Sequence, residues 1–235
     1  NNALTGRIAL SYTLPDDTLL YASFNRGYRA GAVNGGGYTS SAGISYIEPE
    51  RVNAYELGFK GRYFDRVLTL AAVLFYYDYT NQQLQDTRPG PVSFLVNTPK
   101  SEVYGAELEA TVKPSDGFAL NFSLGLLQTK YKELLLQGTD LSGNDLPFSP
   151  KLTAQAGFDW DVAELGGSKL TFSPNLNYAS RQYFSPFNTI NAVDAAVGRA
   201  RPIIRAARAE ARAVFHAAGI TYRTADDDPR RAQVT

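Results

Sequence analysis

The sequence predicts an all-β fold, a fragment of a transmembrane barrel with about eight antiparallel up-and-down strands, followed by a short α-helical C-terminal tail. Two observations predict the barrel. Between Thr5 and Phe187, segments of ten or more residues carry apolar side chains at every second position, which is the period of a strand with one apolar and one polar face. Short polar turns alternate with long loops rich in Gly, Pro and Asn, which is the connectivity of transmembrane barrels.

The alternation is clearest over residues 169–178, where Leu170, Phe172 and Leu176 share one face. The intervening positions hold Lys, Thr, Ser and Asn. A helix would instead gather residues three or four positions apart on one face, and that spacing does not fit this segment. We therefore expect a sheet with one apolar and one polar face.

The first four strands are predicted over residues 7–14, 18–29, 51–64 and 67–81. Pro15-Asp16-Asp17 supplies a short turn after the first strand and Asp65-Arg66 supplies one after the third, because Pro and Asp favour turn conformations. A long loop with Gly35-Gly36-Gly37 runs from the second strand to Pro49. The fourth strand is apolar on both faces in its middle, so the pattern leaves its orientation open.

The last four strands are predicted over residues 101–113, 118–126, 151–162 and 169–178. Short turns are predicted at residues 114–117 and 166–168, and long loops over residues 82–96 and 137–150. Every second connection is therefore short. In transmembrane barrels the short turns face the periplasm and the long loops face outward.

Acidic residues of the polar face favour a water-filled interior, because a carboxylate against lipid is costly. They are Glu56, Glu107, Glu109, Asp159 and Asp161. The same alternation also describes a soluble sandwich or a propeller blade. Strand length favours the membrane barrel, since soluble strands average about 5–6 residues and these reach 12 or more.

Composition excludes several other classes. With no Cys there is no disulfide framework, zinc–thiolate site or thiol nucleophile. The chain has neither Met nor a signal peptide before Asn1, so we expect a fragment of something longer. The net charge is 0, and we expect no nucleic-acid partner, no cofactor, no metal site and no catalytic residue.

Four segments carry a resemblance to a known family. They read YASFNRGYRAG (21–31), EPERVNAYELGFKG (48–61), SEVYGAELEA (101–110) and FSPKLTAQAGFDW (148–160). In order and spacing, residues 3–187 resemble the barrel of a TonB-dependent outer-membrane receptor. The resemblance implies a 22-stranded barrel with an N-terminal plug domain, in the outer membrane of a Gram-negative bacterium. It is not an enzyme family.

What the resemblance implies for function is active uptake of a scarce ligand, such as a ferric siderophore, cobalamin or a saccharide. The energy comes from the inner-membrane proton gradient through TonB, which acts on the plug. The implied partners are thus outer-membrane lipid, the ligand and, in the full-length parent, TonB. The plug and the closing strands are absent from this sequence, so we expect that the fragment alone neither closes a barrel nor transports.

Five residues of the predicted loops and strand ends are candidate ligand contacts: Tyr28, Arg29, Tyr38, Arg88 and Tyr183. Arg and aromatic side chains suit an anionic, ring-bearing ligand. A structural alternative exists for two of them. Tyr28 would then be part of an interfacial aromatic girdle, and Arg29 would be an ion-pair partner inside the barrel.

The tail predicts a separate unit, so we divide the chain into a barrel portion (1–188) and a tail (189–235). Of its 47 residues 13 are Ala, and it holds 8 Arg but no Lys. Apolar residues at helical spacing predict a helix over residues 200–218. NAVDAAVG (191–198) and RAEARAVFHAAGI (208–220) resemble the C-terminal helical domain of ketopantoate reductases. That family's lysine is missing before Asn191, as is a GxGxxG turn, so reductase activity is not expected.

Two alternatives to a receptor fragment stay open at this point. In one, the chain is a fusion protein whose tail is a ketopantoate-reductase-derived interaction module. In the other, it is a soluble β-rich binding domain. The lone His216 has no partner for catalysis or metal binding, and we expect it to be structural.

Overall fold

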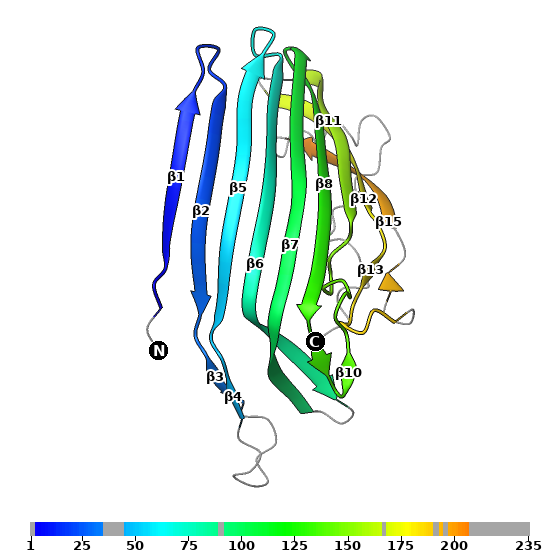
Figure 1. Ribbon diagram of the computed structural model, residues 1–235. Coiled ribbons are helices and arrows are strands. Elements are labelled where there is room, and N and C mark those ends of the chain that lie inside the picture. Colours follow the sequence, from blue (N-terminus) through cyan, green and yellow to red (C-terminus); the bar gives the residue numbers. More distant parts are fainter. Residues whose placement is uncertain are drawn as a thin grey trace, which may run out of the picture.

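The strands of one antiparallel sheet account for most of the computed structural model, which describes residues 3–34, 45–88, 92–165, 168–189, 193–194 and 197–206. From one edge to the other, its nine strands are β1 (Gly6–Thr13), β2 (Leu19–Arg29), β5 (Glu50–Tyr63), β6 (Leu68–Arg88), β7 (Val92–Ser115), β8 (Phe118–Glu133), β11 (Leu152–Leu165), β12 (Ser168–Ala179) and β15 (Val197–Ala206). The sheet curves from β1 to β15 (Figure 1). Neighbours are paired in sequence order, which confirms the predicted up-and-down topology.

Three two-stranded ladders accompany the sheet. They pair β3 (Ala32–Asn34) with β4 (Ser45–Ile47), β9 (Leu135–Leu136) with β10 (Thr139–Asp140), and β13 (Gln182–Tyr183) with β14 (Val193–Asp194). These ladders lie at the end of the sheet where the long connections gather, which we call the loop end (Figure 1). The short connections gather at the opposite end, which we call the turn end.

The register keeps apolar residues opposite one another across the sheet. One such row runs through Ala22, Leu57, Leu74, Ala106 and Leu126, on five successive strands. These side chains are not covered by protein: Leu57 and Leu74 are each 58% exposed. A sandwich would bury this face under a second sheet, but the described residues form one layer. An uncovered apolar face of this kind fits contact with lipid.

The opposite face is polar and holds the predicted acids. The hydroxyl of Tyr77 donates to Glu56 (2.9 Å), and the amide of Asn121 donates to Asp159 (3.0 Å). The hydroxyl of Thr171 donates to Asp161 (2.7 Å). Glu107 and Glu109 line a hollow of about 330 Å³ on this face together with Ser123, Gln155 and Asn177. The prediction of a polar, acid-bearing inner face is confirmed.

An aromatic row crosses the apolar face near the loop end. The rings of Phe24 and Tyr55 lie 5.1 Å apart, those of Tyr55 and Tyr76 lie 6.4 Å apart, and those of Tyr76 and Tyr104 lie 6.4 Å apart. A second set near the turn end joins Phe158 to Phe118 and Phe172. Two aromatic bands flanking an apolar zone are typical of a barrel that spans a membrane.

The prediction of a loop over residues 82–96 is wrong for residues 82–88 and 92–96. They extend β6 and β7, with pairs from Gln82 opposite Thr98 to Arg88 opposite Val92. The extension bends at Asn81 and Pro99, which leave the ladder between the flanking pairs. Asn81 has a positive φ of 53°, which Asn tolerates better than most residues, and Pro99 has no N–H to donate. Figure 1 shows both strands turning aside here.

The predicted helix over residues 200–218 is wrong for residues 200–206, which belong to β15. Ten backbone pairs join β15 to β12, including Ala200 opposite Leu176 and Ile204 opposite Phe172. Pro202 is tolerable because β15 is an edge strand of the described sheet. Small and apolar residues also alternate with Arg over 197–206, so a strand period fits this short segment as well as a helical one. Residues 207–218 lie outside the described residues.

Candidate functional site

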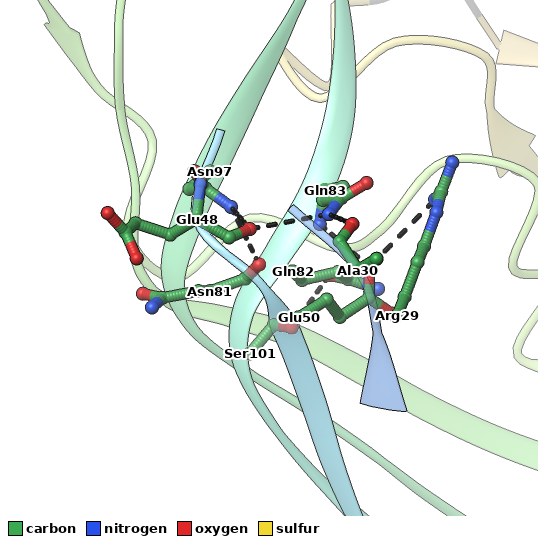
Figure 2. Close-up of polar contacts among 9 residues, drawn as sticks. All are labelled: Arg29, Ala30, Glu48, Glu50, Asn81, Gln82, Gln83, Asn97 and Ser101. Carbon is green, nitrogen blue, oxygen red and sulfur yellow. Dashed lines mark hydrogen bonds and ion pairs between the residues drawn. The ribbon is translucent and has the colours of Figure 1, made fainter. Parts of the chain in front are cut away.

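The loop end carries a network of polar contacts among Arg29, Ala30, Glu48, Glu50, Asn81, Gln82, Gln83, Asn97 and Ser101 (Figure 2). We call it the loop-end network. Its members come from the end of β2 and the residue after it, from the start of β5 and the segment before it, and from β6 and β7 around their bend. The network therefore joins parts of the chain that are separated by up to about seventy residues.

Asn97 is the central member of the network. Its amide nitrogen donates to the carbonyls of Glu48 (3.0 Å) and Asn81 (2.9 Å), and its amide oxygen accepts the N–H of Glu48 (2.8 Å). One side chain thus satisfies the carbonyl at the bend of β6 and both backbone groups of Glu48. These three hydrogen bonds connect the bent hairpin to the start of β5.

Gln83 and Glu50 make the second connection. The N–H of Gln83 donates to Glu50 Oε2 (2.9 Å), and its side-chain amide donates to the carbonyls of Ala30 (2.8 Å) and Glu48 (3.3 Å). The guanidinium of Arg29 lies 4.0 Å from Glu50 Oε2 and its side chain is 60% exposed. Such an exposed, long ion pair contributes little to stability, so Arg29 presents most of its donors to solvent.

Asn34 repeats the same device on the neighbouring ladder. Its amide nitrogen donates to the carbonyl of Leu95 (2.9 Å), and its amide oxygen accepts the N–H of Leu95 (3.2 Å). This two-way contact imitates a strand pair and ties β3 to β7. Further along the hairpin, the amide of Gln137 donates to the buried carboxylate of Asp86 (2.6 Å).

A small apolar cluster lies beside the bent hairpin. It consists of Tyr131, Leu134, Leu136 and Leu141, and partly buried Leu84, Val96, Leu146 and Phe187 pack against it. Tyr131 is 1% exposed. The cluster joins the hairpin of β6 and β7 to the connection between β8 and β11. Apolar burial in this part of the chain therefore stabilises the loop end, whereas the apolar face of the sheet is left uncovered by the described residues.

Asp140 closes a turn of this loop. The N–H of Ser142 donates to its carboxylate (2.9 Å). Hydrogen bonds from the side chain and backbone of Ser142 lower the pKa of Asp140 below its ordinary value. The hydroxyl of Ser142 in turn accepts the N–H of Leu134 (3.2 Å), so the turn is linked to the apolar cluster.

The structure locates the five predicted ligand contacts unevenly. Tyr28 and Arg29 are neighbours in β2 and lie on opposite faces, Tyr28 on the side of Phe24. The hydroxyl of Tyr28 is buried and has no partner among the described residues. Arg29 makes the contact with Glu50 that the structural alternative expects. Tyr183 lies in β13, where its carbonyl accepts the N–H of Phe148 (2.8 Å).

The side-chain positions of the other two candidates, Arg88 and Tyr38, are not among those that the structure describes. Arg88 ends β6, and Tyr38 lies outside the described residues. Among the described residues, Arg29 contacts Glu50, which also accepts the N–H of Gln83. Whether any of the five contacts a ligand stays a prediction.

Sequence reasoning missed Asn97, Gln83 and Glu50. Glu48 and Glu50 belong to the segment EPERVNAYELGFKG, which could have drawn attention to the start of β5. Asn97 and Gln83 fall in a segment predicted as a loop, and nothing in its local pattern identifies their distant partners.

Two features are absent from the described residues. No helix there is long and apolar enough to cross a membrane. No group of three or more His, Cys, Asp or Glu residues there is arranged to hold a metal ion.

Fold and site together define one wall of a membrane-spanning β-barrel with a structured loop end. The family described as TonB dependent receptor-like, beta-barrel matches residues 1–231. The chain therefore belongs to this family, whose members are outer-membrane proteins of Gram-negative bacteria, and the outer membrane is its location.

Individual relatives agree with this assignment. The pesticin receptors of Yersinia enterocolitica and Yersinia pestis are each 27% identical over 159 residues, which cover 66% of this chain and 22% of the relative. The crystal structure of the ferric yersiniabactin uptake receptor FyuA from Yersinia pestis has a TM-score of 0.66 at 22% identity, over 84% of this chain and 29% of that one. BauA, the ferric preacinetobactin receptor from Acinetobacter baumannii, has a TM-score of 0.60 at 22% identity, over 84% and 28%.

The matched residues differ between the individual relatives and the family as a whole. The chain spans about a fifth of the length of the curated relatives it matches. Because the family match extends to residue 231, the comparisons do not support the predicted resemblance of residues 189–235 to ketopantoate reductases. The boundary between units at residue 188 stays a prediction.

Proposed function

We propose that this chain forms part of the wall and outer mouth of a receptor that takes up a ferric siderophore by TonB-dependent transport. The observation that carries the proposal is the loop-end network, which fixes the bent hairpin of β6 and β7 beside the exposed guanidinium of Arg29. A receptor needs a preorganised outer surface, since ordering loops on binding weakens affinity.

The names of the relatives support a ferric siderophore over the other ligand classes of the family. FyuA and BauA are described as receptors for ferric yersiniabactin and ferric preacinetobactin. Cobalamin and saccharides are the competing classes. An anionic ferric chelate would suit the donors of Arg29, because a guanidinium binds carboxylate and phenolate oxygens with several directed hydrogen bonds.

Within this proposal the five predicted residues have defined roles. Arg29 and Arg88 supply positive charge to the ligand, and Tyr38 and Tyr183 supply rings, whereas Tyr28 lies on the lipid side with Phe24 and has its role in the aromatic girdle. Outer-membrane lipid surrounds the wall, and TonB acts through a plug domain supplied by the remainder of the receptor. The chain is a transport component and not an enzyme. The uncovered apolar face argues against a soluble binding domain, and the pairing of β15 with β12 argues against a tail that acts as a separate interaction module.

The test uses the full-length receptor that contains this chain, expressed in a strain without other siderophore receptors. Growth on a panel of ferric siderophores, with cobalamin and maltodextrins as comparison ligands, identifies the ligand class. We expect growth on at least one ferric siderophore. Uptake of cobalamin or a saccharide alone would contradict the proposal.

Arg29→Ala tests the contact itself. We expect about a tenfold or greater loss of siderophore affinity, since hydrogen bonds to charged groups contribute about 1.5–3 kcal/mol, measured by fluorescence quenching with the purified receptor. Arg62→Ala, on the inner face near the turn end, is the matched control and should bind normally. Equal affinities of the two variants would remove Arg29 from the site.

A further inference from the structure

Arg29 and Glu50 are paired directly opposite each other where β2 meets β5, on the polar face at the loop end. The guanidinium of Arg29 lies 4.0 Å from Glu50 Oε2, and the two side chains are 60% and 17% exposed. The cation is therefore open to solvent, whereas the carboxylate beside it is largely covered.

Glu50 is held in place independently of Arg29. Its Oε2 atom accepts the N–H of Gln83 at 2.9 Å, and the side chain of Gln83 donates in turn to the carbonyls of Ala30 and Glu48. The contact with Arg29 is longer, at 4.0 Å, than the about 2.7–2.9 Å of a charge-assisted hydrogen bond. The anion is thus fixed and the cation is loosely attached, so Arg29 can leave Glu50 without disturbing the network.

A loose pair of this kind makes a ligand compete for the guanidinium. An exposed ion pair contributes little to stability, so the contact with Glu50 is easily exchanged for a stronger one. A carboxylate or phenolate group that makes two directed hydrogen bonds to the guanidinium is such a partner. A group that makes one weak contact gains nothing over Glu50, and specificity is a difference of this kind between competing contacts.

We propose that Glu50 is a specificity-determining residue of the outer mouth. Its fixed carboxylate occupies Arg29 in the empty receptor and gives the guanidinium up to an anionic ligand that binds it more strongly. The inference rests on the proposed uptake function, because it assigns the charge class of the ligand that Arg29 recognises. A neutral chelate takes no part in the exchange.

The experiment measures binding by the full-length receptor and four variants: Glu50→Gln, Glu48→Gln, Arg29→Ala, and Arg29→Ala combined with Glu50→Gln. Glu50→Gln removes the charge but keeps an oxygen that can accept the N–H of Gln83. Glu48→Gln is the matched control, since it removes the same charge from the same segment and Figure 2 shows the carboxylate of Glu48 directed away from Arg29. The probes are a ferric tris-catecholate, which is anionic, and a ferric tris-hydroxamate, which is neutral, and fluorescence quenching gives each dissociation constant.

We expect Glu50→Gln to bind the tris-catecholate about two- to fivefold more tightly, the range that corresponds to one exposed ion pair. Its affinity for the tris-hydroxamate, and both affinities of Glu48→Gln, should equal those of the unaltered receptor. When Arg29→Ala is present, Glu50→Gln should have no further effect, because the guanidinium is gone. The proposal is overturned by a gain that persists without Arg29, by an equal gain in Glu48→Gln, or by the absence of a gain in Glu50→Gln.

Hydrogen exchange at the amide of Gln83 shows whether Glu50→Gln preserves the network. If exchange there becomes faster, Glu50→Asp takes its place as the deciding variant, because it keeps the charge. Glu50→Asp should then bind the tris-catecholate as the unaltered receptor does, and a gain equal to that of Glu50→Gln would overturn the proposal.

A measurement without a chelate separates this inference from the uptake function. The reagent p-hydroxyphenylglyoxal modifies accessible guanidinium groups, and peptide mass spectrometry gives the rate at Arg29. We expect modification about two- to fivefold faster in Glu50→Gln than in Glu48→Gln, because the paired carboxylate no longer shields the guanidinium. Equal rates would overturn the proposal. If neither chelate binds to any form, the uptake function is contradicted, and the modification rate alone decides whether Glu50 occupies Arg29.

Discussion

Asn97 makes three of the polar contacts at the loop end, as many as Gln83, although its own segment has no distinctive pattern in the sequence. Its three hydrogen bonds serve backbone groups of Glu48 and Asn81. Two of these bonds are open to solvent, and the carbonyl of Glu48 also accepts from Gln83, so each bond contributes about the 0.5–1.5 kcal/mol of an ordinary hydrogen bond. The importance of this residue therefore comes from the two segments that it links, the start of β5 and the bend of β6.

Asn97→Ala should loosen the start of β5 and the bend of β6. We expect local opening there to become easier by about 0.5–1.5 kcal/mol, seen as faster hydrogen exchange at the amide of Glu48. Gln128→Ala is the control, because Gln128 is exposed and lies on the neighbouring strand β8. Unchanged exchange at Glu48 in the Asn97 variant would show that the network does not stabilise this end.

Asp140 gives a pH dependence at the same scale. Its folded pKa is lowered, first by the side-chain and then by the backbone hydrogen bond of Ser142. The stabilisation is thus fully present above the pKa of the unfolded chain, and it is lost as the pH falls through the lowered folded pKa. In Ser142→Ala the pKa should rise toward its ordinary value in an NMR titration of the carboxyl group. A pKa that does not move would assign the shift to another cause.

At the scale of elements, the bent hairpin of β6 and β7 links the sheet to the loop end. Polar contacts hold one side of it, and the apolar cluster of Tyr131, Leu134, Leu136 and Leu141 holds the other. Leu134 and Leu135 are adjacent and chemically identical, but Leu134 is 2% exposed and Leu135 is 72% exposed. Substituting each in turn therefore compares a packed leucine with an unpacked one.

Leu134→Ala should detach the hairpin from this cluster. The expected cost is about 2–5 kcal/mol of local stability, measured as increased protease cleavage and hydrogen exchange between Leu84 and Val96. Leu135→Ala removes the same atoms from an exposed position and should change stability by no more than about 0.5 kcal/mol. Similar effects of the two substitutions would mean that the cluster does not hold the hairpin.

At the scale of the whole molecule, the described sheet is open. Its order begins with β1 and ends with β15, and these two strands do not pair with each other. Unpaired strand edges favour association with other chains, and a membrane-spanning sheet requires closure, because backbone groups at an open edge have no water to bind.

The 235-residue chain refolded alone in detergent should therefore show β-structure by circular dichroism without the heat-modifiable mobility of a closed barrel. It should also form no stable pore in planar bilayers. The full-length receptor is the control and should show the mobility shift. A discrete, heat-modifiable monomer of the isolated chain would contradict this expectation and indicate that the sheet closes on itself.

Eight of the nine strands could be predicted because period-two alternation is a local property. Leu170, Phe172 and Leu176 identify their own face without reference to any partner. The ninth strand could not be predicted, because the Ala- and Arg-rich residues 197–206 fit a helical period as well as a strand period. Their ten backbone pairs with β12 are what make them a strand. The extension of β6 and β7 was missed for a related reason, because polar Gln and Asn residues show no alternation even when they pair.

The sequence by itself determined the strand order, the apolar and polar faces, the family and the location of this protein, because each follows from local periodicity or from ordered motifs. Only the tertiary structure decided the bend at Asn81 and Pro99, the contacts of Asn97 and Gln83, and the alignment of Phe24, Tyr55, Tyr76 and Tyr104 in one row. These features join residues far apart in the chain. Their partners are set by strand register, and register is visible only when the strands lie side by side.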